Sequence, residues 1–141
     1  MAARVATLSV GKAILVTGGA GYVGAHVCEG LAAAGYRPVV LDNLSTGRRA
    51  FARWGPLIEG DVWDAELVRR TLVEHDIRAV LHFAASSVVP ESVRAPLDCY
   101  RNNLGGLFGL LGGMRAAGVN TLVFSSTCLL YTSDAADEGL G

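Results

Sequence analysis

The stretch Val16-Thr17-Gly18-Gly19-Ala20-Gly21-Tyr22-Val23-Gly24 decides the fold that we predict for this chain. A continuous apolar run at residues 13–17 leads into its glycines and apolar residues at helical spacing follow them, so the stretch joins a buried strand to a helix. Gly18, Gly21 and Gly24 stand three residues apart; such glycines permit a tight turn, close approach of the backbone to a pyrophosphate, and close helix–strand packing. Free N–H groups at the start of a helix attract phosphates. The stretch therefore favours a turn that binds a dinucleotide.

Two alternatives compete with this interpretation of the turn. A P-loop needs Lys-Ser or Lys-Thr after its last glycine, whereas Ala25 and His26 follow Gly24. A glycine-rich turn that binds no ligand is the second alternative. The context favours the dinucleotide turn, because a strand precedes it, a helix follows it, and Asp42 ends the next predicted strand.

Short apolar runs alternate with longer helical patterns along the rest of the chain. We expect strands at residues 13–17, 38–41, 57–59, 79–83 and 121–124, and helices at residues 22–34, 64–75 and 96–117. Strands that alternate with helices across short links are typical of a parallel sheet with helices on both faces. We therefore predict an α/β fold, a Rossmann-like doubly wound parallel sheet that is truncated after about the fifth strand.

The helix expected at residues 96–117 is unusually rich in glycine. Its glycines are Gly105, Gly106, Gly109, Gly112 and Gly113. A glycine inside a helix costs about 1 kcal/mol relative to alanine. We expect close packing of this helix against a neighbouring element to offset that cost.

The composition excludes several classes of protein. The chain has 141 residues, of which 51% are hydrophobic and 18% charged, and its net charge is −1. This apolar fraction excludes intrinsic disorder, and the near-neutral charge argues against a nucleic-acid partner. The sequence offers no stretch of about 20 apolar residues, so we expect no membrane span.

The cysteines and histidines indicate neither disulfides nor a metal site. The cysteines are Cys28, Cys99 and Cys128, and the histidines are His26, His75 and His82. An odd number of cysteines without C-x-x-C spacing indicates reduced thiols in a cytoplasmic protein. The histidines are scattered and form no metal-ligand pattern, so we expect no metal.

Asp42, at the end of the second predicted strand, bears on the choice of cofactor. A carboxylate at this place accepts hydrogen bonds from ribose hydroxyls and disfavours a 2′-phosphate. Arg48 and Arg49 follow closely and can in principle receive such a phosphate. Because Asp42 stands at the strand end whereas the arginines lie on a predicted loop, we favour NAD over NADP.

Gly60-Asp61-Val62 follows the third predicted strand. In a sheet with strand order 3-2-1-4-5, an adenine ring would lie beside these residues. Taken alone, Asp61 is also typical of a turn residue or a helix cap. Both interpretations of Asp61 stay open.

Several segments of the chain recur in order in a known family. They are residues 17–24, 41–47, 60–61, 82–85, 96–103 and 124–127. Over about residues 12–127 the chain resembles the NAD-dependent epimerase/dehydratase family of the extended short-chain dehydrogenase/reductases. Three stretches are much more similar to the members that epimerise UDP-sugars at C4: residues 42–47, residues 82–85, and the stretch from Pro90 to Asn103. A different epimerase or dehydratase of sugar nucleotides, and a non-catalytic dinucleotide-sensing module, are the alternatives.

The resemblance implies NAD as cofactor, with contacts distributed over four segments. The implied contacts are Gly18, Gly21, Tyr22, Val23 and Gly24 at the pyrophosphate, Asp42, Asn43, Leu44, Ser45, Thr46 and Gly47 at the adenosine ribose, Asp61 and Val62 at the adenine, and Phe83, Ala84, Ala85, Ser86, Ser87 and Asn102 on the nicotinamide side.

The resemblance also implies a reaction. Thr127 matches the catalytic Ser/Thr of the family, which hydrogen-bonds the C4 oxygen of the sugar. In the family a tyrosinate removes the C4 hydroxyl proton while the C4 hydride passes to NAD, and the hydride then returns to the other face of the 4-keto sugar. The implied partners are a UDP-sugar substrate and, for the full-length protein, a second copy in a homodimer.

The tyrosine base of the family is not recognisable in this chain. That base belongs to a Tyr-x-x-x-Lys pair, because a phenol of pKa near 10 needs a nearby cation to act as a base at neutral pH. The tyrosines at 22, 36, 100 and 131 are followed four residues later by His, Val, Leu and Ala, and the only lysine is Lys12. We therefore expect the chain by itself to be inactive as an epimerase.

We expect three parts along the chain. Residues 1–11 form an N-terminal leader, and residues 12–127 form an incomplete NAD-binding Rossmann domain. Residues 128–141, CLLYTSDAADEGLG, resemble the translation of a sequencing-library adapter, so we expect a non-native tail that packs poorly.

Overall fold

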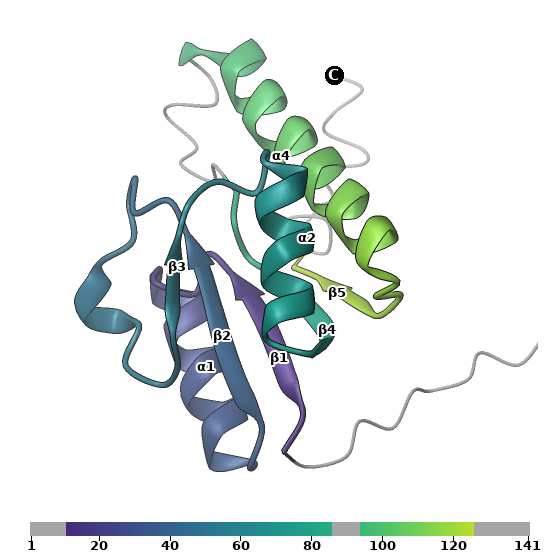
Figure 1. The fold of residues 1–141 in the computed structure, drawn as a ribbon. Coiled ribbons are helices and arrows are strands. Elements are labelled where there is room, and N and C mark those ends of the chain that lie inside the picture. Colours follow the sequence, from purple (N-terminus) through teal and green to yellow (C-terminus); the bar gives the residue numbers. More distant parts are fainter. Residues whose placement is uncertain (1–10, 86–93, 126–141) are drawn as a thin grey trace, which may run out of the picture.

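The computed structural model describes residues 11–85 and 94–125, which form a five-stranded parallel sheet (Figure 1). The strands are β1 (Ala13–Thr17), β2 (Arg37–Asp42), β3 (Leu57–Glu59), β4 (Ile77–His82) and β5 (Leu122–Phe124). Their order in the sheet is β3-β2-β1-β4-β5, and every neighbouring pair is parallel. This confirms the predicted doubly wound sheet, in which the winding direction reverses between β1 and β4.

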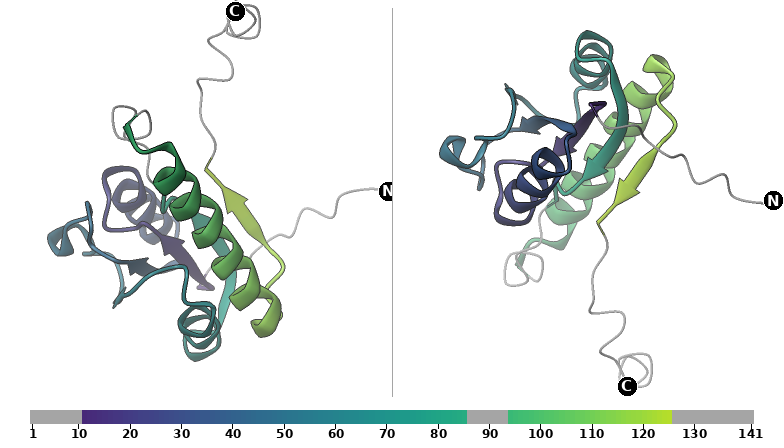
Figure 2. Two further views of the ribbon diagram at one scale, coloured as in Figure 1. Left: turned by 90° about the horizontal axis from the view of Figure 1, so that it is seen from above. Right: turned by 90° about the horizontal axis from the view of Figure 1, so that it is seen from below.

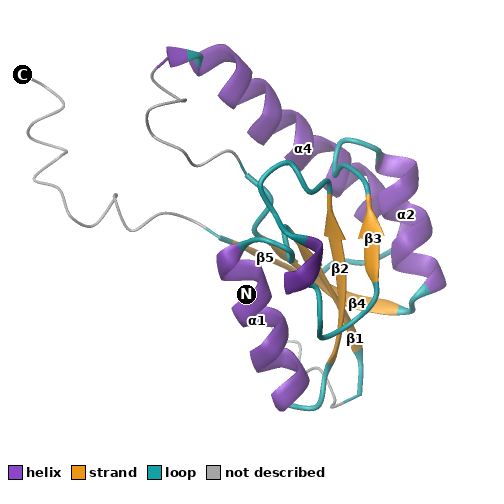
Figure 3. Ribbon diagram, turned by 90° about the vertical axis from the view of Figure 1, so that its left-hand side faces the viewer, coloured by secondary structure: helices purple, strands orange, loops and turns teal. Residues whose placement is uncertain are grey.

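Helices cover both faces of the sheet. They are α1 (Tyr22–Ala33), α2 (Ala65–Glu74) and α4 (Pro96–Ala117), with a short 3-10 turn η1 (Arg49–Phe51). In Figure 3 the sheet stands between α1 on one side and α2 with α4 on the other, and the views of Figure 2 agree. The predicted elements match these bounds within one or two residues, except that η1 lies where we expected only a loop. Among the described residues, no helix is both long and apolar enough to cross a bilayer.

The alternation of side chains along the central strands builds two hydrophobic clusters. Leu15 and Leu41 face α2 and α4, where they pack with Leu110. Val16 and Val40 belong to the second cluster, on the face that α1 covers. Successive residues of a strand point to opposite faces, so strands that are buried on both faces are continuously apolar, as residues 13–17 are.

The helix ends follow from local sequence. Asp64 caps α2 as its side chain accepts hydrogen bonds from the N–H groups of Glu66 and Leu67. Pro96 begins α4, where its missing N–H costs nothing. Gly118 ends the same helix with a left-handed φ of +71° that suits glycine.

The glycines of α4 lie against α2 and the loop that precedes it. A Cβ atom on Gly106 would stand 2.9 Å from Cγ2 of Val62, and one on Gly113 would stand 2.5 Å from Cγ1 of Val68. A Cβ on Gly109 would overlap the carbonyl oxygen of Val62. The expected close packing of the glycine-rich helix is therefore confirmed, because side chains at these positions would push α4 away from α2.

Candidate functional site

A cleft of about 520 Å³ opens at the carboxyl ends of the strands. It lies beside the glycine-rich turn, at the edge of a parallel sheet where ligands bind when the winding direction reverses. Volumes of this size are typical of small-molecule sites. Its lining consists of Gly18, Gly21, Tyr22, Val23, Gly24, Leu41, Asp42, Asn43, Ser45, Thr46, Gly60, Asp61, Val62, Phe83, Ala84, Ala85 and Asn102. The structure thus brings together residues from all four segments that the sequence analysis singled out.

The glycine-rich turn leaves no room for side chains. Gly18 has a φ of +69°, and a Cβ on it would stand 2.7 Å from the backbone nitrogen of Ala84. A Cβ on Gly24 would overlap the carbonyl oxygen of Gly18. A side chain at either position would displace the strand–helix packing that gives the turn its shape.

The first turn of α1 faces the cleft and suits an anion. Gly21 is the N-cap, no side chain caps the helix, and its first turn contains no acidic residue. The first N–H groups of a helix lack intrahelical partners and carry the positive end of the helix dipole. Tyr22 and Val23 line the cleft in this turn. The turn can therefore receive the phosphates of a dinucleotide, and the residues present fit that group.

The carboxylate of Asp42 is pinned to the glycine-rich turn. Asp42 is only 8% exposed, and its Oδ2 accepts the N–H of Ala20 at 3.0 Å. Its Oδ1 accepts the N–H of Leu44 at 2.8 Å. Each carboxylate oxygen has a second lone pair, so Asp42 can still accept hydrogen bonds from a ligand in the cleft. A side chain in this position can hold the two hydroxyls of a ribose.

Two of the predicted contacts, Leu44 and Gly47, are not among the residues that line the cleft. Leu44 packs on the hydrophobic cluster that includes Val16 and Val40. Gly47 lies against the carboxylate of Asp42, where a Cβ would stand 2.9 Å from Oδ1. In this structure both residues contact Asp42, which lines the cleft. Leu44 donates its N–H to the carboxylate, and Gly47 leaves space for it.

Asp61 is a turn residue, which is one of the two interpretations that the sequence left open. Its Oδ1 accepts the N–H of Trp63 at 3.1 Å, which shapes the turn before α2. Its Oδ2 accepts a hydrogen bond from Nδ2 of Asn43 at 2.9 Å. Asp61 also lines the cleft, so it links the segments after β2 and β3 along one rim.

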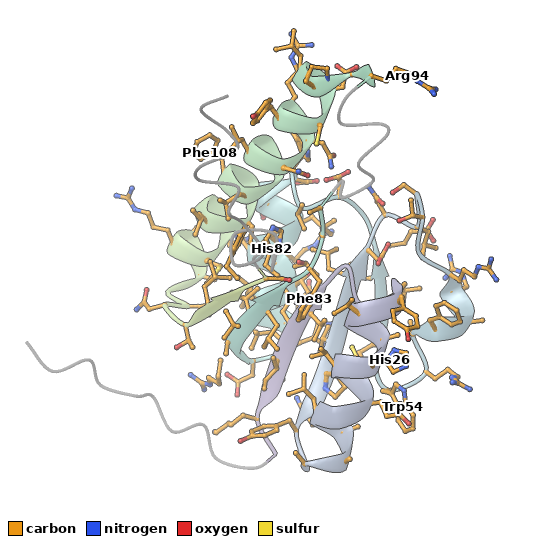
Figure 4. The ribbon with its side chains drawn as sticks, turned by 180° about the vertical axis from the view of Figure 1, so that it is seen from behind. His26, Trp54, His82, Phe83, Arg94 and Phe108 are labelled. Atoms are coloured by element: carbon orange, nitrogen blue, oxygen red, sulfur yellow. The ribbon has the colours of Figure 1, made fainter. Side chains whose placement is uncertain are left out.

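Thr17 and His82 form a buried pair where β1 and β4 end. They are register partners, and Oγ1 of Thr17 lies 2.6 Å from Nδ1 of His82. The ring of His82 lies 5.6 Å from that of Phe124 on β5, so His82 connects three strands. Burial lowers the pKa of His82 below its ordinary value. Figure 4 labels His82 beside Phe83, which lines the cleft.

Sequence reasoning missed this pair, because it considered His82 only as a metal ligand and as part of a motif. It also missed Leu41, which lines the cleft. The position of Leu41 directly before Asp42 was the available signal. Three predicted site residues, Ser86, Ser87 and Thr127, lie outside the described residues, as does the expected tail.

Comparison with known proteins finds the same family that the sequence resembles. Residues 14–139 match the NAD dependent epimerase/dehydratase family. The UDP-glucose 4-epimerase of Rhizobium leguminosarum bv. trifolii is 52% identical over 121 residues, covering 86% of this chain and 37% of that protein. A UDP-glucose 4-epimerase sequence of Klebsiella pneumoniae is 40% identical over 126 residues, covering 84% of this chain and 91% of that sequence.

Solved structures are similar as well. The structure of UDP-glucose 4-epimerase from Brucella ovis in complex with NAD has a TM-score of 0.83 and 45% identity, over 86% of this chain and 38% of that one. The Thermotoga maritima enzyme with UDP-glucose has a TM-score of 0.76 and 39% identity, over 82% of this chain and 38% of that one. This chain spans 34–37% of the length of the first three curated relatives. With its family matched over residues 14–139, the chain belongs to the NAD-dependent epimerase/dehydratase family.

Proposed function

We propose that this chain is the NAD-binding part of a UDP-glucose 4-epimerase, which interconverts UDP-glucose and UDP-galactose by transient oxidation at C4. The observation that carries the proposal is the carboxylate of Asp42, held by the N–H of Ala20 in a cleft that the start of α1 also lines. The similarity to UDP-glucose 4-epimerases supports the choice of reaction.

In this proposal each part of the cleft has its own task. The start of α1 binds the diphosphate, Asp42 binds the adenosine ribose, and Asp61 and Val62 flank the adenine. Phe83 and Asn102 line the nicotinamide side. Bound NAD would supply acceptance and return of the C4 hydride. Thr127 would hydrogen-bond the C4 oxygen of the sugar.

The 141-residue chain by itself is proposed to bind NAD weakly and not to complete the reaction. None of its four tyrosines is followed by lysine four residues later, so the cation that lowers the pKa of the tyrosine base is missing from this sequence. A UDP-sugar substrate belongs to the whole protein in this proposal. A cytoplasmic location, expected from the cysteine pattern, stays a prediction.

A homodimer is the proposed assembly of the whole protein. One face of α4 exposes a stripe of large apolar side chains at helical spacing. The stripe consists of Leu97, Tyr100, Leu104, Phe108 and Leu111, which are between 41% and 70% exposed. Contiguous exposed apolar surface of this kind is typical of interfaces between proteins.

Two glycine variants of α1 test whether NAD binds in the cleft at the start of this helix. A Cβ on Gly21 meets only the carbonyl oxygen of Gly18, at 3.2 Å, so Gly21→Ala is expected to fold. The added methyl group stands at the N-cap, where the diphosphate would approach, and we expect NAD affinity to fall about tenfold. Gly30→Ala, on the same helix with nothing within 4 Å, is the matched control. Calorimetric titration that finds equal affinities for the two variants, or none for the wild type, contradicts the proposal.

A chimera tests the reaction. Residues 12–125 would replace the matching segment of the Rhizobium leguminosarum UDP-glucose 4-epimerase, which supplies the rest of the protein. We expect the chimera to convert UDP-galactose to UDP-glucose and the isolated chain to show no turnover. A chimera that folds and binds NAD but leaves UDP-galactose unchanged would contradict the proposed reaction.

A further inference from the structure

Three acidic residues lie close together in the sheet and the turn after it: Asp42 and Asp61, which line the cleft, and Glu59, which does not. Asp42 and Glu59 are register partners on β2 and β3, so their side chains point to the same face of the sheet. Asp61 follows two residues after Glu59 and lines the cleft beside Asp42. A ligand that carries a further phosphate at this end would meet the carboxylates of Asp42 and Asp61, with Glu59 on the strand next to Asp42.

Arg49 forms an ion pair with one of these carboxylates, that of Glu59. Nη2 of Arg49 donates a hydrogen bond to Oε2 of Glu59, forming an ion pair. The loop that carries Arg49 lies at the β3 edge of the sheet (Figure 1). It is attached to the glycine-rich turn, because the N–H of Arg48 donates to the carbonyl of Ala20 at 2.9 Å. Gly47, two residues before Arg49, lies against the carboxylate of Asp42.

A 2′-phosphate on the adenosine ribose would need a cation at this place. Arginine is suited to the task since its guanidinium donates two parallel hydrogen bonds to a phosphate. Arg49 starts from a backbone position near the ribose end, but its guanidinium is turned to Glu59. Glu59 therefore does two things at once: it occupies the arginine and adds a negative charge beside Asp42.

We propose that the Glu59–Arg49 ion pair is a second determinant of the preference for NAD over NADP. Asp42 disfavours the 2′-phosphate directly, and Glu59 withholds the arginine that would otherwise neutralise it. The inference rests on the proposed NAD site. Both partners are exposed, at 66% and 54% of their side chains, and exposed pairs are weak. The expected effect is therefore a change of about threefold to fivefold in relative affinity.

The test is the ratio of the dissociation constants for NAD and NADP, measured by calorimetry on the 141-residue chain at one fixed salt concentration. Glu59→Gln frees Arg49, so NADP affinity is expected to rise about threefold to fivefold relative to NAD affinity. The double variant Glu59→Gln with Arg49→Gln is expected to lose that gain. Glu66→Gln removes the matched ion pair with Arg69 on α2 and is expected to leave the ratio unchanged.

An unchanged ratio in Glu59→Gln, with NAD binding intact, overturns this inference alone. A gain that persists in the double variant also overturns it, since Arg49 would then not be the group that receives the phosphate. Loss of NAD binding in the wild-type chain instead overturns the proposed function, and this inference with it.

Discussion

The N–H groups of Ala20 and Leu44 both donate hydrogen bonds to the carboxylate of Asp42, which is nearly buried and lines the cleft. The same side chain therefore shapes the turn and presents acceptors to a ligand. A buried N–H that loses its acceptor costs about 1–3 kcal/mol. A substitution at this residue must change stability and ligand binding together.

Asp42→Asn tests that double role. The amide retains one acceptor oxygen, but its NH₂ group cannot accept the N–H of Ala20 or Leu44, whichever it faces. We expect the free energy of unfolding to fall by about 1–3 kcal/mol and NAD affinity to fall about tenfold. Denaturant unfolding and calorimetric titration measure the two effects. The control is Asp64→Ala, which removes the cap of α2 and is expected to cost about 1 kcal/mol without weakening NAD binding.

His82 gives the protein a pH dependence of stability. In the folded protein, burial lowers the pKa of His82 below its ordinary value of 6.5. As pH falls through 6.5, His82 therefore takes up a proton in the unfolded chain before it does so in the folded protein. The contribution of His82 to stability is complete above about pH 6.5 and is lost as pH falls from 6.5 through the folded pKa.

His82→Gln is expected to flatten this dependence. Glutamine retains groups that can hydrogen-bond the hydroxyl of Thr17 but does not titrate. The wild type should therefore lose more free energy of unfolding between pH 7.5 and pH 5.5 than the variant does. Equal losses, measured by denaturant unfolding at both pH values, would contradict the assignment.

At the scale of elements, α4 shows how tertiary packing overrides helix propensity. Its glycines weaken the isolated helix, yet they allow its backbone to approach the loop at Val62 and the start of α2. The two effects have opposite signs for a substitution to alanine. Which effect wins depends on the neighbour that each glycine meets.

Gly109→Ala and Gly112→Ala separate the two effects. The Cβ of the first would overlap the backbone carbonyl of Val62, which cannot rotate away, so we expect a loss of about 1–3 kcal/mol. The Cβ of the second meets only Cβ of Ala65 at 3.5 Å, an ordinary contact, so we expect a gain of up to about 1 kcal/mol. Thermal unfolding of the two variants checks the signs, and a stabilised Gly109→Ala would show that α4 packs less closely.

At the scale of the whole molecule, α4 has two different faces. Its glycines face α2, whereas the apolar stripe of Leu97, Tyr100, Leu104, Phe108 and Leu111 is exposed, with Phe108 projecting outward (Figure 4). Exposed apolar stripes on soluble proteins favour association. The proposed homodimer therefore makes a specific prediction about this helix.

Phe108→Glu is expected to weaken self-association of the chain at least tenfold, because a charge placed inside an apolar interface must be desolvated. Phe108 is 70% exposed, so the substitution should leave the fold intact. Val73→Glu, at a residue of α2 that is 57% exposed, is the matched control and should leave association unchanged. Sedimentation velocity over a range of concentrations measures both. Equal association constants for the wild type and Phe108→Glu would remove α4 from the proposed interface.

Sequence reasoning was most successful where one local pattern suffices. The turn between strand and helix at residues 18–24 and the start of a helix at Asp64 depend on short segments, and both were predicted. The 3-10 turn at Arg49–Phe51 was missed, since it depends on how the loop is attached to Ala20. Within the segment 42–47, the sequence predicted a ligand contact for every residue but not that Leu44 packs on the core and Gly47 on Asp42.

The order of apolar and glycine-rich segments by itself determined the parallel sheet and the turn beside its edge, because hydrophobic periodicity and backbone freedom are local properties. Only the tertiary structure decided that Thr17 contacts His82, 65 residues away, and that Glu59 forms an ion pair with Arg49. Those contacts depend on strand register and on the path of the loop between β2 and β3, and neither is encoded in any single stretch of the chain.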